Sequence, residues 1–454
     1  MKKCRFSSKL MMLNKQIKIQ TAMVNIAFKG KDVKPNGGVA FILGAFDKYG
    51  LTSLADSTLG IRGKFGLGFS YGDILRTLCS SFIAGYDRIE DVNRIKKAWG
   101  DHHAIPSSDV VGRGLKELAD YDVEREAKTG GKFRFNLVER MNELLVRQVK
   151  QLGLLEGRES VTVDFDHQLV ASENRDTQWS YKKVRGNFPG IMSIGDIIVG
   201  VENRVGNAPV KAAQETTLEN FFERLKDICG VKIGFFRADA GSYSVEIIKT
   251  VMKYCRHFLI RANMSAARAE MYRQHKDWMP TKIGKLHCEV ASFEDCTLIE
   301  GTRLRLVVQR VPDLDDDGIQ KVSAFGPEYV YRAIITNNWK KSERWIIKFY
   351  NRRGASERNF DMQNNDFGWA HMPFSHLNEN GVFLASTAFA KNFYVFFRRF
   401  VSEAFPEIDC ACRVKRFVAE FVSVPAKWIF SGRRWTLNLY STHQGYRQLY
   451  DLLN

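Results

Sequence analysis

The stretch WIIKFYNRRGASERNFDMQNND, residues 345–366, decides how the rest of the chain is interpreted. Tyr350, Arg353 and Glu357 are three and four residues apart, so a continuous helix would place them on one face. A glutamate held beside an arginine and a phenol presents one negative charge in a fixed position, where it can bind a metal ion. The same spacing also fits a solvated helix face with an ordinary Arg–Glu pair. Two strands upstream favour the first interpretation, because each of them runs into an aspartate.

Composition points to a polyanionic partner. The chain has 454 residues, of which 44% are hydrophobic, and its formal net charge is +17. This length suits roughly two to four domains of a soluble globular protein. Such an excess of lysine and arginine indicates nucleic acid as the first candidate partner, and a basic protein without a polyanionic partner is the alternative.

Cysteine spacing and hydropathy argue against a structural zinc site, a signal peptide and a membrane span. The eight cysteines form no C-x-x-C pair, and the spacing of Cys410 and Cys412 does not suit a structural zinc site. No apolar run of signal-peptide length follows the basic start MKKCRF. The most apolar later segment, 383–397, is interrupted by Lys391 and Asn392. Phenylalanines at helical spacing in and after it are predicted to form core rather than a base-stacking platform: Phe389, Phe393, Phe396, Phe397 and Phe400. We therefore expect a cytoplasmic, nucleoid-associated protein with reduced thiols and no membrane span.

Helical and strand periodicities divide the chain into five segments. We expect a mostly helical N-terminal region for DNA contact or assembly, with one early strand near 17–28. A catalytic core in two parts would follow, separated by a β-rich inserted subdomain, and then a basic, aromatic tail. The predicted boundaries are 1–155, 156–262 (core, first part), 263–342 (insertion), 343–410 (core, second part, with the Glu357 helix) and 411–454.

The order of the elements in the core predicts its fold. Strands are expected at 161–166, 179–184, 196–201, 231–236 and 257–262. The first three would form an antiparallel meander, and helices would separate the last two, the first of them opening with a capping box at Thr216 and Glu219. This is the order of an α/β, RNase H-like core, a mixed sheet flanked by helices. The fold needs one more helix to deliver its last acid, and residues 345–366 supply it.

Three acids form the candidate catalytic and metal-binding set. Asp166 ends the first strand, Asp239 follows the fourth, and Glu357 belongs to the late helix. Carboxylates are the ligands that Mg²⁺ or Mn²⁺ prefers, and two such ions about 4 Å apart would activate the attacking oxygen and stabilise the leaving one. Asp164 lies on the same strand face as Asp166, so alternation does not separate them. Position nearer the strand end favours Asp166, with Asp164 as a further metal candidate.

Three segments resemble the motifs of a known family. They are DFDHQ (164–168), RADAGSYS (237–244) and YNRRGASERNF (350–360), and they are similar to the motifs of DDE insertion-sequence transposases with a Tyr-x2-Arg-x3-Glu-x6-Lys signature. A weaker resemblance extends from about residue 37 to the C-terminus. It implies an RNase H-like core with a β-strand insertion between the second aspartate and the glutamate.

The resemblance also implies an activity and a partner. Such a transposase binds the terminal inverted repeats of its own element, as a homodimer assembled on DNA. It catalyses metal-dependent strand cleavage and strand transfer to target DNA, and in relatives the element is released through a hairpin intermediate.

Several DNA contacts follow from the resemblance, with two departures. Tyr350 and Arg353 would contact DNA phosphate near the cleaved end. Asn364 is a further candidate DNA contact; it stands where the signature has its lysine, so the charge that would bind a phosphate there is absent. His167 and Gln168 follow the first aspartate where the family has a small residue and a hydroxyl. We interpret His167 as a polar neighbour of the acids rather than a metal ligand.

The tail interleaves basic and aromatic residues, which suits phosphate contact plus base stacking. An amphipathic helix and a terminal strand packed on the core would give a similar pattern. The candidate DNA contacts in the tail are Lys415, Arg416, Arg433 and Arg434.

Two other functions fit the same sequence. One is an RNase H-like DNA endonuclease or resolvase that mobilises nothing, and the other is a DNA-binding derivative that has lost catalysis. The presence of all three acids argues against the second, whereas Asn364 argues for it. Matched inverted repeats flanking the gene would identify a mobile element.

Overall fold

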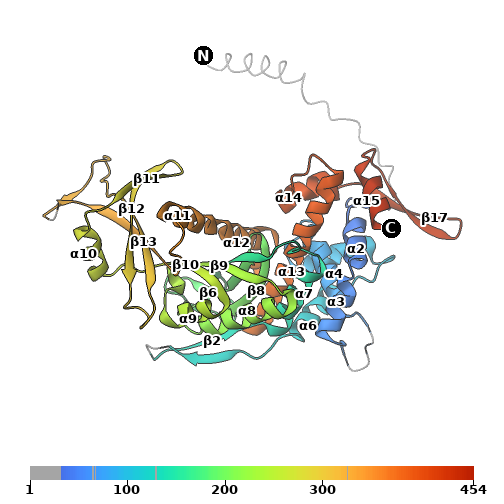
Figure 1. Ribbon diagram of the computed structural model, residues 1–454. Coiled ribbons are helices and arrows are strands. Elements are labelled where there is room, and N and C mark those ends of the chain that lie inside the picture. Colours follow the sequence, from blue (N-terminus) through green and yellow to red (C-terminus); the bar gives the residue numbers. More distant parts are fainter. Residues whose placement is uncertain (1–31, 64–65, 67, 128–129, 325) are drawn as a thin grey trace, which may run out of the picture.

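One large mixed sheet, with helices packed on it, runs through the molecule (Figure 1). The computed structural model describes residues 32–63, 66, 68–127, 130–324 and 326–454. The strand expected near 17–28 lies outside these residues. The N-terminal helices lie at one end of the molecule and the strands of residues 279–336 at the other (Figure 1).

The N-terminal third is mostly helical. Its helices are α2 (Val39–Lys48), α3 (Leu51–Leu59), α4 (Tyr71–Ile83), α5 (Val92–Trp99), α6 (Ser108–Lys116) and α7 (Glu139–Gln151), with the short 3₁₀ helix η1 (Ile89–Asp91) before α5. A hairpin of β1 (Val123–Glu126) and β2 (Lys132–Asn136) precedes α7 and joins the edge of the main sheet. α4 illustrates why these segments form helices. Ser70 and Asp73 form a capping box at its start, and nearly every residue of the helix is buried in the core.

The centre of the sheet is built from five strands. They are β3 (Ser160–His167), β7 (Gly190–Ile194), β8 (Ile197–Arg204), β9 (Lys232–Ala238) and β10 (Cys255–Arg261). β3, β7 and β8 are antiparallel neighbours, whereas β9 is parallel to both β3 and β10. Two helices make the parallel connections, α8 (Gln214–Cys229) before β9 and α9 (Val245–Tyr254) after it. Ala213 precedes α8, so Thr216 and Glu219 lie inside the helix instead of capping it.

The middle strand of the meander differs from the sequence prediction. It is β7 and not residues 179–184. The segment expected to form it belongs to a separate small sheet of β4 (Val170–Ala171), β6 (Arg185–Asn187) and β5 (Gln178–Trp179). The reason is burial: every residue of β7 is buried, whereas Trp179 is 67% exposed and Tyr181 73% exposed. A central strand has no room for solvated side chains of this size.

The strands of the segment expected as an insertion continue the main sheet. After α10 (Ala266–Gln274) they are β11 (Met279–Ile283), β12 (Leu286–Asp295), β13 (Leu304–Pro312) and β16 (Tyr329–Thr336). β14 (Val322–Ser323) and β15 (Gly326–Pro327) form a small hairpin between β13 and β16. β16 pairs antiparallel with β10, which gives the sheet order β1-β2-β8-β7-β3-β9-β10-β16-β13-β12-β11.

The stretch 345–366 contains two helices and not the single one expected. α11 (Glu343–Asn351) ends in a 3₁₀ turn, η3 (Arg352–Gly354), and α12 (Ala355–Asp366) follows. Glycine is a weak helix former, and the Arg353 side chain is drawn into an ion pair with Asp166. Tyr350, Arg353 and Glu357 therefore belong to three successive elements rather than to one helix face.

The longest helix, α13 (Leu377–Ala404), is the centre of the core. Phe389, Phe393 and Phe397 are fully buried on it, and Phe46 from α2 packs edge-on against the first two rings. This confirms the prediction that these aromatic residues form core. The short 3₁₀ helix η4 (Trp369–His371) lies between α12 and α13, and α14 (Val414–Phe417), the π turn η5 (Val418–Val422), β17 (Ala426–Ser431), β18 (Arg434–Leu439) and α15 (Gly445–Leu453) complete the chain. Within the described ranges, no helix combines the length and apolar character needed to cross a membrane.

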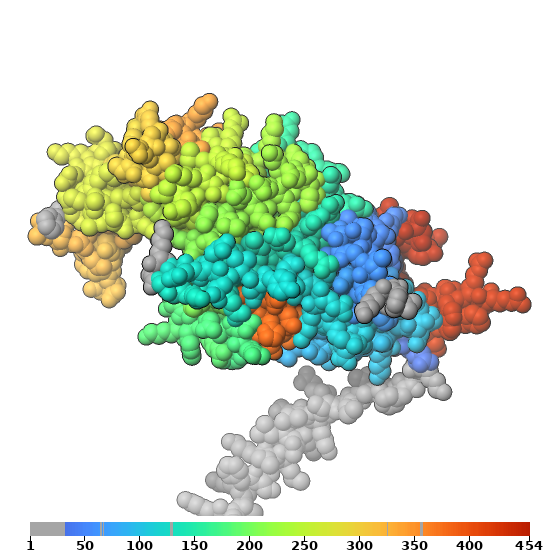
Figure 2. Space-filling view, turned by 90° about the horizontal axis from the view of Figure 1, so that it is seen from below, coloured from blue at the N-terminus to red at the C-terminus, as the bar shows by residue number. Residues whose placement is uncertain are grey.

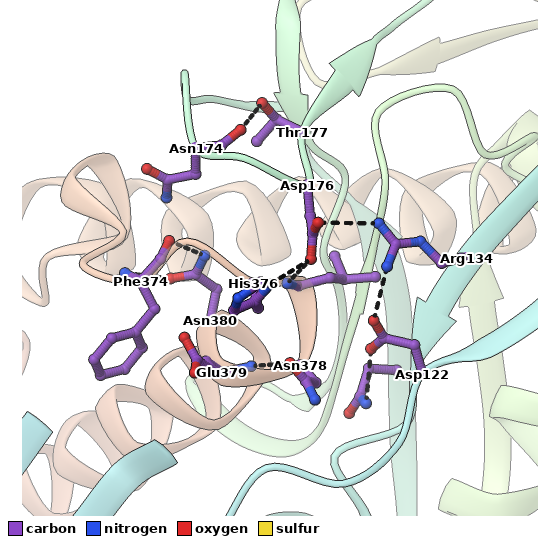
Figure 3. A network of polar contacts seen from close by, with 12 residues as sticks. Asp122, Arg134, Asn174, Asp176, Thr177, Phe374, His376, Asn378, Glu379 and Asn380 are labelled. Carbon is purple, nitrogen blue, oxygen red and sulfur yellow. Dashed lines mark hydrogen bonds and ion pairs between the residues drawn. The ribbon is translucent and has the colours of Figure 1, made fainter. Parts of the chain in front are cut away.

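A carboxylate fixes the start of α13 (Figure 3). Asp176 Oδ2 accepts a hydrogen bond from the Leu377 backbone N–H at 3.1 Å, and the Arg134 guanidinium lies 3.3 Å from Oδ1. Arg134 also contacts Asp122 at 3.4 Å, so the network ties the β1–β2 hairpin to the helix. Burial alone would raise the pKa of Asp176, but the Leu377 N–H and Arg134 outweigh it and lower that pKa.

Replacing this carboxylate should destabilise the fold. Asp176→Ala leaves the Leu377 N–H without its acceptor and removes one of the two carboxylates that contact Arg134, so the free energy of unfolding should fall by about 1–3 kcal/mol at pH 7. Because the folded-state pKa is depressed, the stabilisation exists above the unfolded pKa of 3.8 and is lost as pH falls through the folded value. Urea titrations of wild type and variant at several pH values measure this difference.

Glu173→Ala is the matched control, because Glu173 is in the same loop and its side chain is 85% exposed. It should change stability by less than about 0.5 kcal/mol. Equal losses in the two variants would contradict a capping role for Asp176.

Candidate active site

Two acids lie side by side at one edge of the main sheet. Asp166 is near the end of β3, and Asp239 directly follows β9. These strands are parallel neighbours with Phe165 opposite Ala238, so both carboxylates lie at the carboxyl ends of adjacent strands. The pKa of Asp166 is raised by burial and by the Asp239 carboxylate, against the opposing charge of Arg353. Mutual repulsion of this kind is relieved when a cation binds between two acids.

Asp164 has a different environment from Asp166. Its two oxygens accept hydrogen bonds of 2.7 Å each from Arg237, which lies opposite it on β9. The side chains are 2% and 8% exposed. Arg237 also donates to the Phe349 carbonyl oxygen at 2.5 Å, and its guanidinium lies over the Phe349 ring. Asp164 is therefore engaged in a buried bidentate pair that joins β3, β9 and α11.

Arg353 and Tyr350 lie next to the two acids. Arg353 Nη1 is 2.6 Å from Asp166 Oδ2, in an ion pair with both side chains 15% exposed. Tyr350 is buried, and its hydroxyl donates to the Ala238 carbonyl oxygen at 3.3 Å. The structure thus brings Asp166, Asp239, Tyr350 and Arg353 together. In this arrangement the Tyr350 hydroxyl faces the protein and not an external phosphate.

Glu357 lies apart from the aspartates. It is exposed on the first turn of α12, with no contact to Asp166 or Asp239. Across the described ranges, no three His, Cys, Asp or Glu side chains are grouped as metal ligands. The Arg353 guanidinium instead provides the positive charge at Asp166. The two aspartates have the hard oxygen donors and the proximity that suit a divalent cation, whereas the predicted third ligand, Glu357, is not grouped with them.

The residues that depart from the family signature make neutral or internal contacts. Asn364 Nδ2 donates to Gln168 Oε1 at 2.9 Å, which links α12 to the loop after β3 without a charge. His167 Nε2 lies 2.5 Å from Glu202 Oε1, with both side chains buried. Glu202 also contacts Arg204 at 2.6 Å, and its pKa is about 2 because Arg204 and His167 outweigh the effect of burial. His167 is therefore paired inside the protein.

A cavity of about 550 Å³ adjoins Asp239. Its lining includes Asp239 and His167, and a second group made of Tyr181, Lys182 and Phe188. The second group comes from the segment that forms the small sheet, so this sheet shapes the approach to the acids.

A buried lysine that sequence reasoning did not assign holds α12 in place. Lys391, on α13, is fully buried and donates from Nζ to Asn359 Oδ1 at 2.9 Å and to the Asp196 carbonyl oxygen. Asn359 is two residues after Glu357 and also donates to the Gly195 carbonyl oxygen at 2.9 Å. Burial lowers the pKa of Lys391 to about 7. The signal in the sequence is a lysine in the middle of an apolar, aromatic helix.

The tail candidates occupy two elements. Lys415 and Arg416 are exposed on α14, and Arg433 and Arg434 are exposed at the turn between β17 and β18. Arg413, before α14, pairs with Asp366 at the end of α12 at 2.6 Å. The start of the tail therefore lies against the helix that bears Glu357.

The mixed sheet and the paired carboxylates at its edge define an α/β protein with an acidic candidate active site. Residues 16–454 match the family model described as "Transposase DDE domain group 1". The chain belongs to this family, which confirms the prediction of a DDE transposase domain. A search of curated proteins gave no match.

Lys391 gives a prediction with a defined sign. Its folded pKa of about 7 is below the usual value of 10.5, so between these values the unfolded chain binds more protons and stability rises with pH. Relative to Lys391→Met, the wild-type free energy of unfolding should rise from pH 7 to pH 10, by up to about 1.4 kcal/mol per pH unit. Denaturant titrations across this range measure the slope, with exposed Lys226→Met as the matched control. Parallel curves for wild type and Lys391→Met would contradict a titrating buried lysine.

Proposed function

We propose that the chain is a DDE-type DNA transposase that binds the terminal inverted repeats of its own insertion sequence and catalyses metal-dependent strand cleavage and strand transfer. Family membership over nearly the whole chain supports the class. The observation that carries the proposal is the placement of Asp166 and Asp239 side by side at the ends of adjacent parallel strands. The net charge of +17 supports DNA as the partner.

The proposed catalytic core is RNase H-like with an insertion. The strand order β8-β7-β3-β9-β10, with an antiparallel meander and two helix-linked parallel strands, supports this core. Residues 263–342 come between the second aspartate and Glu357, as an insertion of the Tyr-Arg-Glu-Lys group would, and their strands extend the sheet. Assignment to that group remains part of the proposal.

Members of this family typically use a divalent metal, here Mg²⁺ or Mn²⁺. Asp166, Asp239 and Glu357 would hold it, and the bound metal would activate the attacking oxygen and stabilise the leaving one. Arg237 keeps Asp164 paired and thereby fixes the strand that presents Asp166.

Glu357 and Arg353 must change position for catalysis in this proposal. The η3 turn before α12 is the natural hinge, because Gly354 has open space around it and Asn359 holds the helix further along. As the first turn of α12 approaches the aspartates, the Arg353 guanidinium would leave Asp166 and become available to a DNA phosphate.

An endonuclease on the same core, without mobilisation, is the second candidate. The observation that favours it is Asn364, whose neutral contact with Gln168 replaces the signature lysine. The two functions differ in their products. Cleaved ends joined to a target plasmid identify a transposase, and cleaved ends that are never joined identify an endonuclease.

The two aspartates on β3 should behave differently when each is changed to asparagine. Asp166→Asn should abolish strand cleavage, because it removes a proposed metal ligand. It should cost less stability than Asp164→Asn, because losing the ion pair with Arg353 is partly offset by losing the repulsion from Asp239. Asp164→Asn should cost about 3–5 kcal/mol of stability, because it leaves Arg237 buried without its charge partner. Urea unfolding combined with a cleavage assay on a duplex bearing the element end separates the two effects. A stable, inactive Asp164 variant and an active Asp166 variant would reverse the assignment.

Glu357 should be required for chemistry and not for binding. Glu357→Gln keeps size and hydrogen bonding but removes the charge, so cleavage with Mg²⁺ or Mn²⁺ should fall at least 100-fold while duplex affinity stays within about threefold. The matched control is Asp361→Asn, on the exposed side of the same helix, which should cleave normally. If Glu357→Gln cleaves at the wild-type rate, Glu357 is not a ligand and the proposed three-acid centre is wrong.

A further inference from the structure

The β17–β18 hairpin projects from the end of the molecule formed by the N-terminal helices (Figures 1 and 2). Its base is fixed by two backbone hydrogen bonds between Lys34 and Ala426, of 2.7 and 2.9 Å. Further along the hairpin, the His102 ring stacks on Trp428 with 4.1 Å between ring centroids, and it contacts Trp435 edge-on with 4.6 Å between centroids. The hairpin is therefore held rigidly at its base while its tip extends into solvent.

The two faces of the hairpin differ in chemistry. Cross-strand partners share a face, and the pairs Trp428–Leu437 and Phe430–Trp435 make one face aromatic. Ser431 and Arg434 pair on the opposite face, which also bears Lys427. The aromatic face packs on His102 near the base, but Phe430 stays 59% exposed and Trp435 55% exposed near the tip. One face thus binds the protein, and the other presents basic and polar groups outward.

The turn places an arginine where glycine is favoured. Gly432 and Arg433 have φ values of +57° and +61°, so both central residues of this two-residue turn are left-handed, as in a type I′ turn. A side chain in this conformation costs free energy that glycine avoids. Among the described residues, the side chains of Arg433 and Arg434 have no hydrogen-bond or ion-pair partner, and both residues are exposed. A strained, solvated arginine at the tip contributes nothing visible to the fold, which points to a role in binding.

The surface beside the hairpin has the same charge. The last turn of α5 exposes Lys96 and Lys97, and Trp99 at the end of that helix meets Trp428 edge-on at 6.2 Å. Basic groups from α5 and from the hairpin therefore lie on one side of the molecule. A concentration of positive charge around a narrow projecting element is complementary to the phosphate-lined groove of a duplex.

We propose that the β17–β18 hairpin is a wing that binds double-stranded DNA, with Arg433 in the minor groove and Arg434 and Lys427 directed to the flanking phosphates. A two-stranded ribbon fits the major groove, about 12 Å wide, whereas a single side chain at the tip of its turn fits the minor groove, about 6 Å wide. Arginine is the side chain most often inserted where that groove narrows over A·T-rich sequence. This inference rests on the proposed function for its partner, DNA, but it concerns a surface separate from the acids.

The test compares full-length variants for binding and for cleavage. Arg433→Gln/Arg434→Gln should weaken binding to a duplex bearing the element end at least tenfold, measured by fluorescence anisotropy. It should also reduce the slope of log affinity against log salt by about 0.9 for each lost phosphate contact. The matched control, Lys226→Gln/Lys249→Gln, removes the same charge from exposed positions on α8 and α9 and should weaken binding less than threefold.

A second variant separates binding from folding. Arg433→Gly relieves the left-handed strain, so its melting temperature should be equal to or above that of wild type while its DNA affinity falls. Netropsin, which occupies the minor groove, should remove most of the affinity difference between wild type and Arg433→Gly. If the hairpin variants bind the duplex as tightly as the control variant does, the proposal that the hairpin binds DNA is wrong. A changed oligomeric state with unchanged DNA affinity would overturn it in favour of an interface between copies of the chain.

The outcome is distinguishable from failure of the proposed function. At protein concentrations that saturate the duplex, the hairpin variants should still cleave it, because their acids are intact. If wild type binds tightly but never cleaves, the transposase proposal fails and the wing stands. If wild type cleaves and the hairpin variants bind as well as the control, only the wing fails.

Discussion

The buried pair of Asp164 and Arg237 is the interaction on which the candidate site depends. Its two hydrogen bonds of 2.7 Å join β3 to β9 one residue pair before the last pair of these two strands. A third hydrogen bond reaches the Phe349 carbonyl oxygen on α11. A bidentate pair in so little solvent tolerates no shift in strand register, because any slip would leave a buried charge unpaired. With the register fixed, the residues that follow, Asp166 and Asp239, are presented at one edge of the sheet.

The proposed mechanism combines this rigid base with one element, the start of α12, that would rearrange. Lys391 and Asn359 hold the middle of α12 against α13 and the β7–β8 turn, whereas the η3 turn leaves the first part of α12 less constrained. In the structure Arg353 neutralises Asp166, and Glu357 faces solvent. An arginine that covers the acids until DNA and metal arrive would keep two repelling carboxylates stable in the free protein.

Much of the fold and part of the candidate site could be predicted from the sequence, because the spacing of apolar residues indicates which side chains are buried. Alternation in residues 161–166 located β3 and its aspartates, and the helical spacing of Phe389 and Phe393 identified core. The family match confirms the class inferred from short motifs. Prediction failed where tertiary contacts decide the outcome. β7 is a short, fully buried run with no alternation to reveal it, and the break in the Glu357 helix depends on a long-range ion pair with Arg353. Lys391 bonds to Asn359 and Asp196, which are 32 and 195 positions away, so the sequence alone shows only a lysine within an apolar helix.

In the proposed mechanism, Asp166 and Asp239 jointly bind a divalent metal when DNA is present. The most direct measurement is a titration of the protein–duplex complex with Mn²⁺, in which electron paramagnetic resonance reports the free ion. Wild type should bind Mn²⁺ more tightly with the duplex than without it, and the Asp166→Asn/Asp239→Asn variant should lose that DNA-dependent binding while still binding the duplex. Equal Mn²⁺ binding by wild type and the double variant, in the presence of DNA, would contradict the account.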